Sequence, residues 1–242
     1  MNLIIDVGNT YVKFAVFSKG KQIKLYKTKT KKIISGLREL LKWKYVFNKA
    51  IISSVGKLNQ TKINTLKKEL DLIILDSELK LPFINKYKTP KTVGADRLAL
   101  VSASVKHYNK SNVLIIDAGT CITYDFITSN NHYLGGAISP GIRLRYKALN
   151  NLTANLPLLE TKHPNTIVGN STAESIHSGV INGVVKEIDG VVKEYKTKYK
   201  DLTVILTGGD TEFLSKQLKS SIFANSNFLL EGLNFILEFN SD

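Results

Sequence analysis

The sequence predicts an α/β protein built from two similar domains, and three observations lead to this prediction. Apolar, β-branched runs typical of strands alternate with segments of helical spacing along the chain. A strand that ends in an acid and a glycine turn occurs twice, at 3–10 and at 113–120. The polar stretch 109–112 precedes the second copy, so we expect domains at 1–111 and 112–242 that face each other across a compact cleft.

The first half of the chain follows the β/α pattern in order. Two β-branched runs separated by Val7-Gly8-Asn9-Thr10 predict two strands joined by a tight turn. Leucine and isoleucine recur at helical spacing in 31–43, and 95–107 shows the same periodicity. The expected strands are 2–6, 11–17, 22–28, 50–52 and 72–75, and a further helix is expected near 59–70.

The second half begins with a strand that ends at Asp117-Ala118-Gly119-Thr120, followed by a β-rich run over 121–127. A later strand ends in Thr207-Gly208-Gly209-Asp210 ahead of an expected helix. Bare glycine backbone there could accept a flat base or a ribose, although a plain strand-to-helix turn explains it equally well. Neither GxxxxGK[ST] nor GxGxxG occurs, which disfavours P-loop and dinucleotide-binding folds.

Composition narrows the class of protein. The chain has 242 residues, 43% of them hydrophobic, which suffices for one large or two modest cores. No run approaches the roughly 20 apolar residues of a membrane span. Cys121 is the only cysteine, so neither a disulfide framework nor a cysteine zinc site is expected. The N-terminus has no basic leader, which favours a cytoplasmic protein.

The formal net charge of +14 raises the question of nucleic-acid binding. The basic residues are mostly scattered lysines, whereas base and phosphate readers favour the arginine fork. We interpret the charge as a solvated, lysine-rich surface that would also attract an anionic substrate. A nucleic-acid partner is therefore not expected.

The first turn carries the chemistry of a phosphate site. Gly8 allows close approach of the backbone, Asn9 and Thr10 add donors, and Asp6 could hold Mg²⁺ or its water shell. Lys13 supplies a mobile positive charge. An ordinary hairpin would use the same residue types. The second copy, at 117–120, favours the functional interpretation.

Gly94-Ala95-Asp96-Arg97 opens the helix expected over 95–107. An acid is favoured at a helix N-terminus, but a cation is not unless it has an anionic partner. The pair suits a substrate with a hydroxyl and a carboxylate, in which Asp96 accepts the hydroxyl proton and Arg97 binds the carboxylate.

Taken together, the motifs resemble those of type III pantothenate kinases, which belong to the superfamily of actin-like ATPases, sugar kinases and Hsp70-type ATPases. The resemblance runs nearly end to end. It rests on Asp6–Thr10 with Lys13, Tyr87 before 94–97, 117–120, 135–141, 169–172, 207–210 and 230–233. It implies two ribonuclease-H-like, actin-like ATPase domains with the active site between them.

The resemblance also implies roles for individual residues. Asp96 would be the catalytic proton acceptor, and Asp117 would ligate a monovalent cation, K⁺ or NH₄⁺. ATP, with Mg²⁺, would contact Asp6, Val7, Gly8, Asn9, Thr10, Tyr11, Val12, Lys13 and Thr120. Pantothenate would contact Tyr87, Gly94, Ala95, Asp96, Arg97 and Thr172. The reaction implied is ATP-dependent formation of 4'-phosphopantothenate, the first step of coenzyme A biosynthesis.

A homodimer is implied as well, with Gly135–Gly141, interpreted as a loop, and the following helix (Ile142, Leu144, Leu149) as the candidate interface. Ordinary core packing would explain these residues equally well. Two departures from the family pattern stand out. Cys121 replaces a common alanine and is expected to be tolerated as a buried hydrophobe. Asn170-Ser171-Thr172 replaces the usual Lys-Asn-Thr.

Three other functions remain open. Another kinase or phosphatase of the same superfamily could act on a different hydroxy acid or on polyphosphate. A ribonuclease-H-like nuclease would need three or four clustered carboxylates around two metals, whereas Asp6 and Asp117 each precede a glycine turn. A non-enzymatic accessory factor for transcription has only the net charge in its favour.

Overall fold

The computed structural model describes residues 1–43, 45–54, 58–76 and 78–241. Contacts divide the chain into two compact units. Unit 1 comprises Met1–Asn109, Asn131–Tyr133 and Asn227–Asp242, and unit 2 comprises Lys110–Asn130 and Leu134–Ser226. The expected domains, 1–111 and 112–242, place the C-terminal segment with the second half of the chain, whereas its contacts lie within unit 1.

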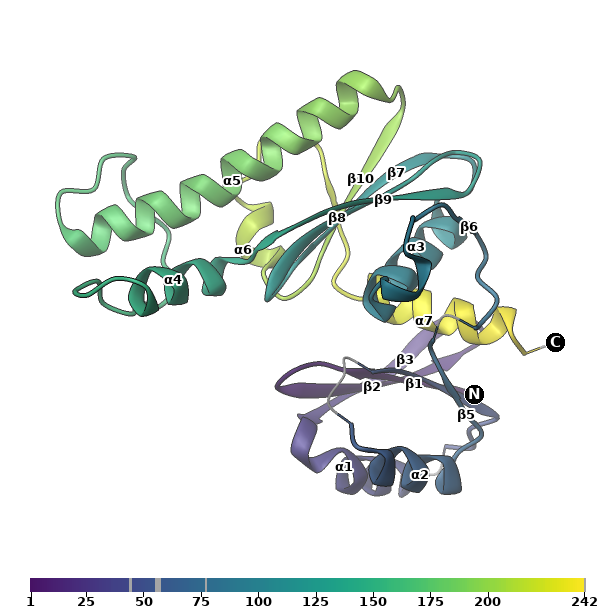
Figure 1. Cartoon of the computed structure of the whole chain (residues 1–242). Coiled ribbons are helices and arrows are strands. Elements are labelled where there is room, and N and C mark those ends of the chain that lie inside the picture. The colour runs from purple at the N-terminus through teal and green to yellow at the C-terminus, as the bar shows by residue number, and fades with distance from the viewer. Residues whose placement is uncertain (44, 55–57, 77, 242) are drawn as a thin grey trace. The chain divides into compact units, whose positions relative to one another are not determined.

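Unit 1 contains a five-stranded sheet in the order β3-β2-β1-β4-β5 (Figure 1). The central strand β1 is antiparallel to β2 and parallel to β4. Leu3, Ile4 and Ile5 of β1 are fully buried, as expected for a strand that is covered on both faces. The strands are β1 (Asn2–Val7), β2 (Tyr11–Ser18), β3 (Lys21–Lys29), β4 (Lys49–Ser54) and β5 (Leu72–Ile74).

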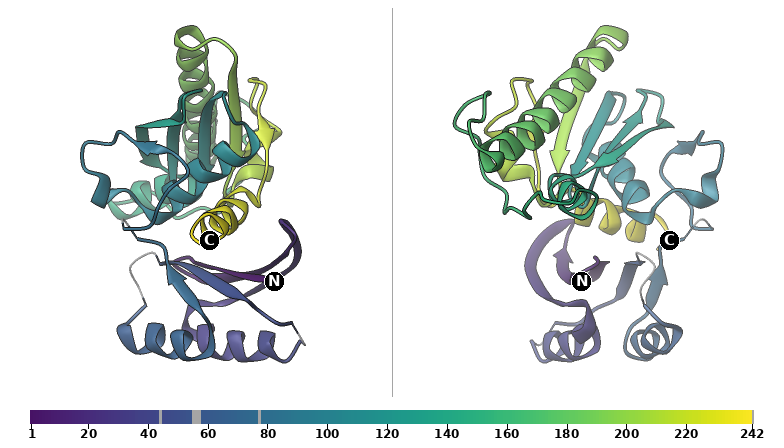
Figure 2. Two further views of the ribbon diagram at one scale, coloured as in Figure 1. Left: turned by 90° about the vertical axis from the view of Figure 1, so that its right-hand side faces the viewer. Right: turned by 60° about the vertical axis from the view of Figure 1, so that its left-hand side comes forward.

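Helices cover both faces of this sheet (Figure 2). Successive side chains of a strand point to opposite faces, so Leu3 and Ile5 pack with α1 and α2, whereas Ile4 packs with α3 and α7. The helices are α1 (Ile33–Leu41), α2 (Gln60–Glu69), α3 (Ala95–His107) and α7 (Phe228–Phe239). The remaining elements are the 3₁₀ turns η1 (Thr30–Lys32) and η2 (Pro90–Thr92), and β6 (Ile84–Asn85), which pairs with His132 and Tyr133.

Helices α3 and α7 pack in backbone contact. A Cβ atom at Gly232 of α7 would lie 1.9 Å from the carbonyl oxygen of Ala99 on α3. Only glycine allows this approach, and it joins segments that are more than a hundred residues apart in the sequence.

Unit 2 contains strands in the order β11-β10-β7-β8-β9. The central strand β7 is antiparallel to β8 and parallel to β10. Its strands are β7 (Asn112–Ala118), β8 (Cys121–Ile127), β9 (His132–Pro140), β10 (Leu202–Thr207) and β11 (Phe223–Ala224). Its helices are α4 (Ile142–Asn151), α5 (Thr172–Lys198) and α6 (Thr211–Ser215).

One face of α5 forms the core of unit 2. Its buried residues Ile176, Val180, Val184 and Ile188 recur at helical spacing and pack with the apolar residues of β7, β8 and β10. Figure 1 shows this long helix running along the sheet.

The two sheets confirm the predicted duplication. The order β3-β2-β1-β4-β5 corresponds strand by strand to β9-β8-β7-β10-β11, with the same antiparallel and parallel partners of the central strand. The mixed α/β fold of two ribonuclease-H-like halves predicted from the sequence is therefore confirmed.

The interpretation of Gly135–Gly141 as a loop is wrong, because residues up to Pro140 belong to β9. A Cβ atom at Gly136 would lie 1.5 Å from the carbonyl oxygen of Tyr124 on β8, so glycine permits the close approach of the two strands. The glycines that suggested a loop are therefore required by strand packing.

Candidate active site

Asp6 lies near the end of the central strand of unit 1, between two polar neighbours. In strand register it is opposite Lys13 of β2 and Ser53 of β4. The Ser53 hydroxyl donates to Asp6 Oδ1 at 3.1 Å, and Lys13 Nζ lies 3.9 Å from Asp6 Oδ2. Burial raises the pKa of the Asp6 carboxyl, Lys13 and Ser53 lower it, and the charge of Asp96 raises it again. Asp6 and Asp96 are thus electrostatic neighbours.

The β1–β2 turn presents its backbone to solvent. The Gly8 amide donates to the Tyr11 carbonyl at 2.9 Å, and the Thr30 hydroxyl donates to the Gly8 carbonyl at 3.0 Å. Asn9 and Thr10 are exposed at the tip, whereas the side chains of Val7 and Val12 are fully buried. The two valines can therefore offer only backbone groups to a ligand.

Asp96 stands in the first turn of α3, after the extended N-cap residue Gly94. Its Oδ1 accepts a hydrogen bond from the Arg97 amide at 2.8 Å, and a Cβ atom at Gly94 would lie 2.4 Å from the same oxygen. The glycine therefore leaves room for this carboxylate. Asp96 and Ala95 are both half-buried. Such a carboxylate can accept a proton from a substrate that reaches the helix end.

Arg97 is 5% exposed and lies beside two aromatic rings. Its guanidinium carbon is 5.5 Å from the ring centroid of Tyr87 and 6.0 Å from that of Tyr133. The two tyrosines are stacked, with centroids 6.2 Å apart and planes at 10°. Cation–π contacts help to orient a guanidinium, and the expected proximity of Tyr87 and Arg97 is present.

Asp117 is the equivalent of Asp6 in unit 2. It lies opposite Thr123 of β8 and Thr207 of β10, on the central strand and one residue before its end. The following turn is tighter than its counterpart in unit 1, because the Gly119 amide donates to the Cys121 carbonyl at 2.9 Å. Thr120 is exposed at its tip.

The glycine turn after β10 packs directly against Asp117. Gly208 has φ +98, and a Cβ atom there would lie 2.4 Å from Asp117 Oδ1 and 2.3 Å from the Ala118 carbonyl oxygen. The Asp210 amide also donates to the Ala118 carbonyl at 3.0 Å. The motifs at 117–120 and 207–210 thus lie together, with Asp117 Oδ1 and the Ala118 carbonyl oxygen next to the Gly208 backbone.

Thr172 lies apart from that turn, at the first residue of α5, where it is exposed. Ser171 caps the helix by accepting the Glu174 amide at 3.3 Å. The segment borders a groove of about 1190 Å³ between α4 and α5, which is lined mainly by apolar residues: Leu149, Leu152, Leu156, Ile176 and Val180.

Metal binding by protein side chains alone is not supported within the part of the chain that the structure describes. No group of three or more His, Cys, Asp or Glu residues is placed there to hold an ion. A single carboxylate such as Asp6 fits an Mg²⁺ ion that takes its other ligands from phosphate and water.

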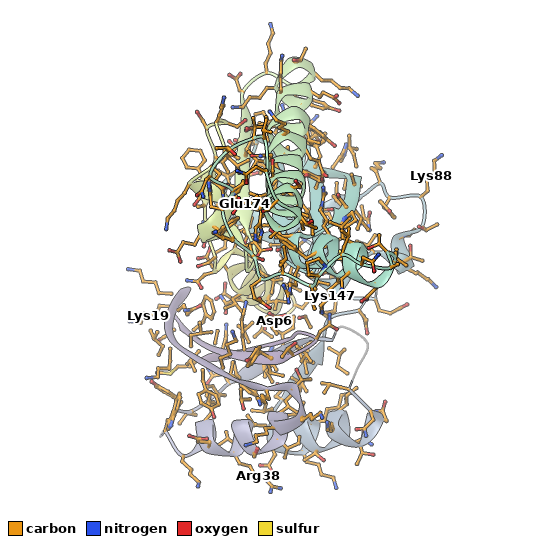
Figure 3. All side chains as sticks on the ribbon, turned by 90° about the vertical axis from the view of Figure 1, so that its left-hand side faces the viewer. Asp6, Lys19, Arg38, Lys88, Lys147 and Glu174 are labelled. Carbon is orange, nitrogen blue, oxygen red and sulfur yellow. The ribbon has the colours of Figure 1, made fainter. Side chains whose placement is uncertain are left out.

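Lys19 and Arg38 project outward from the periphery of unit 1 (Figure 3). Among the described residues, no helix has the length and apolar character needed to span a membrane.

Several contacts were not predicted from the sequence. Ser53 and Tyr133 stand outside every motif. Strand register places Ser53 beside Asp6, and Tyr133 pairs with Asn85 of β6, two residues before Tyr87. The expectation that Cys121 is buried is wrong, because its side chain is exposed at the start of β8. The preceding turn is too tight to cover it.

Comparison with solved structures identifies the class. A Campylobacter jejuni protein assigned to the Baf family of transcriptional activators has a TM-score of 0.63 at 22% identity, covering 99% of this chain and 98% of that one. A Listeria monocytogenes protein described as an N-acetylmannosamine kinase has a TM-score of 0.57 at 14% identity, covering 98% and 99%. These likenesses show a shared fold, in agreement with the actin-like fold that the sequence predicts.

The family follows from sequence. The model of the family "Type III pantothenate kinase" matches residues 2–194. The type III pantothenate kinase of Christiangramia forsetii is 52% identical over 240 residues, which cover 99% of each chain. This chain therefore belongs to the type III pantothenate kinase family.

Proposed function

We propose that this protein transfers the γ-phosphoryl group of ATP to the primary hydroxyl of pantothenate. The hydroxyl oxygen forms a bond to the γ-phosphorus, the bond from that phosphorus to the β–γ bridging oxygen breaks, and ADP leaves. The hydroxyl proton goes to Asp96. The observation that carries the proposal is the placement of Asp96 beside Arg97 at the start of α3, where Arg97 is buried and makes a cation–π contact with Tyr87.

In unit 1, we assign the acceptor to the α3 end. Arg97 would bind the pantothenate carboxylate with two parallel hydrogen bonds, supported by Tyr87 and by the backbone of Gly94 and Ala95. The Asp6–Lys13 segment would bind the phosphates of ATP. Asp6 would hold Mg²⁺ through its water shell, and the metal would neutralise charge on the phosphates.

In unit 2, Thr120 would contact ATP and Asp117 would ligate K⁺ or NH₄⁺. The convergence of Asp117 Oδ1 and the Ala118 carbonyl beside Gly208 supports this assignment. Thr172 would contact pantothenate. Because the reaction consumes ATP, we place it in the cytoplasm.

A homodimer is also proposed. Leu144 of α4 and Ile138 of β9 are 39% and 64% exposed, and Leu152 at the groove between α4 and α5 is 83% exposed. Ile142, in contrast, is 1% exposed and belongs to the core. A second copy of the chain would cover the exposed apolar residues. Light scattering on the wild type and on Leu152→Asp tests this, and a monomeric wild type would rule it out.

A coupled assay of ATP consumption tests the activity. ADP formation should require pantothenate, and replacing potassium by sodium should slow it at least severalfold. A panel of other hydroxy acids and sugars serves as the control. Stimulation by one of these but not by pantothenate would assign the site to a different substrate, and indifference to the cation would argue against the role of Asp117.

A further inference from the structure

The carboxylate of Glu187 joins three elements of unit 2. It lies midway along α5, and its Oε1 accepts a hydrogen bond from the Tyr124 hydroxyl of β8 at 2.8 Å. Its Oε2 accepts a hydrogen bond from Arg145 Nη2 of α4. Burial raises the pKa of Glu187, but hydrogen bonds from Arg145, Tyr124 and Ser139 outweigh this and hold it below the usual value. Glu187 is thus ionised at neutral pH.

Arg145 also forms hydrogen bonds with the end of β9. Its Nε donates to the Pro140 carbonyl and its Nη2 donates to the Ser139 hydroxyl, both at 2.9 Å. The side chains of Arg145 and Glu187 are 22% and 27% exposed, so the pair is largely shielded from solvent. A planar guanidinium held at several nitrogens has little freedom to rotate.

The end of β9 in turn packs on the turn after β7. The Gly141 amide donates to the Thr120 carbonyl at 3.1 Å. A Cβ atom at Gly141 would lie 2.0 Å from the Gly119 carbonyl oxygen and 2.6 Å from that of Thr120. The two backbones are therefore in direct contact, and any shift of β9 at Ser139–Gly141 must move this turn.

We propose that Glu187 is a positioning residue for nucleotide binding: through Arg145 and the end of β9, it holds the Gly119–Thr120 turn in the conformation that receives ATP. The inference rests on the proposed function in one respect, the contact of Thr120 with the nucleotide. Without the carboxylate, Arg145 loses the anion that fixes its orientation. The turn then samples other positions, and ATP binding must restore the competent one.

Two substitutions separate this role from general packing. In Glu187→Gln the side-chain oxygen can still accept from Tyr124, but the charge that holds Arg145 is lost. In Tyr124→Phe the contact with Arg145 remains and only the phenol is lost. Glu160→Gln is the matched control. Glu160 pairs at 2.8 Å with Arg143, which lies on the same helix as Arg145, but Glu160 is 89% exposed.

The experiment measures the Kd of a non-hydrolysable ATP analogue by calorimetry, the KM values for ATP and pantothenate, and the thermal midpoint of each variant. We expect Glu187→Gln to raise the Kd and the KM for ATP about tenfold, with the KM for pantothenate changed less than about twofold. Tyr124→Phe and Glu160→Gln should keep the Kd within about twofold of the wild type, even if Tyr124→Phe lowers the thermal midpoint.

The outcomes distinguish the inference from the proposed function. A wild-type Kd in Glu187→Gln would overturn the inference while pantothenate turnover by the wild type stands. The inference would also be overturned if Glu187→Gln and Tyr124→Phe lost the same affinity for the ATP analogue and if that loss followed the fall in the thermal midpoint. Nucleotide binding without pantothenate turnover would overturn the function only, whereas a wild type that binds no nucleotide would overturn both. If Glu187→Gln does not fold, Arg145→Lys takes its place with the same expected loss of ATP affinity.

Discussion

The Ser53 hydroxyl donates a hydrogen bond to Asp6 Oδ1, and the two residues are direct partners across the parallel pair β1–β4. The bond stabilises the ionised carboxylate, which burial disfavours. Ser53 is 1% exposed, so no water can replace its hydroxyl without rearrangement. The neighbouring strand thus stabilises the charge on which metal binding by Asp6 would depend.

Ser53→Ala should raise the pKa of Asp6 further, since one of the groups that lower it is removed. We expect kcat/KM for ATP to fall about tenfold at neutral pH, the equivalent of about 1.4 kcal/mol. The acidic limb of its pH profile should move to higher pH. Ser104→Ala is the control, because Ser104 is equally buried but donates within α3 to the Leu100 carbonyl. An unchanged pH profile in Ser53→Ala would contradict the prediction.

Asp6→Asn should separate stability from activity. The pKa of Asp6 is raised in the folded protein, so the group favours folding when protonated, and this contribution is lost as the pH rises through the folded-state pKa. At neutral pH the ionised Asp6 therefore destabilises the fold, and the asparagine variant should be more stable by up to about 1 kcal/mol while it loses turnover. Denaturant unfolding at several pH values measures this. The difference in unfolding free energy between the variant and the wild type should vanish below the usual pKa of 3.8. A variant less stable than the wild type at neutral pH would contradict a raised pKa for Asp6.

Asp96→Asn should nearly abolish turnover, by roughly 10²–10⁴-fold, because the amide cannot accept the hydroxyl proton. ATP binding should be intact, since the amide keeps the oxygen that accepts from the Arg97 amide. Calorimetry with ATP and the coupled assay measure the two quantities separately. Normal turnover in this variant would remove Asp96 from the reaction.

Arg97 should depend on its aromatic neighbours. Arg97→Lys keeps the charge but loses the planar fork, so we expect the KM for pantothenate to rise by about 100-fold with a smaller change in kcat. Tyr133→Leu should raise the same KM severalfold by removing one ring that faces the guanidinium, whereas Tyr133→Phe keeps the ring and should bind normally. If Tyr133→Phe and Tyr133→Leu behave alike, ring stacking does not orient Arg97.

Cys121 offers a probe of the second turn. Its exposed thiol directly follows Thr120, so bound ATP should slow its alkylation at least severalfold. Mass spectrometry of the labelled protein with and without ATP measures the rate, and Cys121→Ser supplies the blank because the chain has no other cysteine. An alkylation rate that ATP leaves unchanged would argue against the contact of Thr120 with the nucleotide.

Much of the fold was predictable because its signals are local. The strands at 2–6 and 121–127 and the helix at 95–107 show the periodicity of their elements, and each forms as predicted. The duplicated Asp-turn motif correctly indicated two equivalent sheets, since β1 and β7 occupy the same place in them.

The remainder depends on contacts between distant segments, which periodicity does not report. Glycines suggested a loop at 135–141, but Gly136 is needed where β9 lies close beside Tyr124 of β8. Ser53 reaches Asp6 through strand register, and the pairing of β9 with β6 brings Tyr133 to the segment that carries Tyr87. The placement of the last helix in unit 1 depends on Gly232 meeting Ala99, which no local pattern reveals.

This last contact has a consequence for synthesis of the protein. Helix α7 supplies Leu230, Leu233 and Ile236 to one face of the β1–β5 sheet, although the last strand of that sheet ends at Ile74, far ahead of Phe228 in the order of synthesis. That face therefore stays partly uncovered until residues 228–239 have been synthesised, and by then every strand and helix of unit 2 has been made. Unit 2 can thus fold before unit 1 is complete. A chain truncated before α7 would lack the residues that cover this face of unit 1.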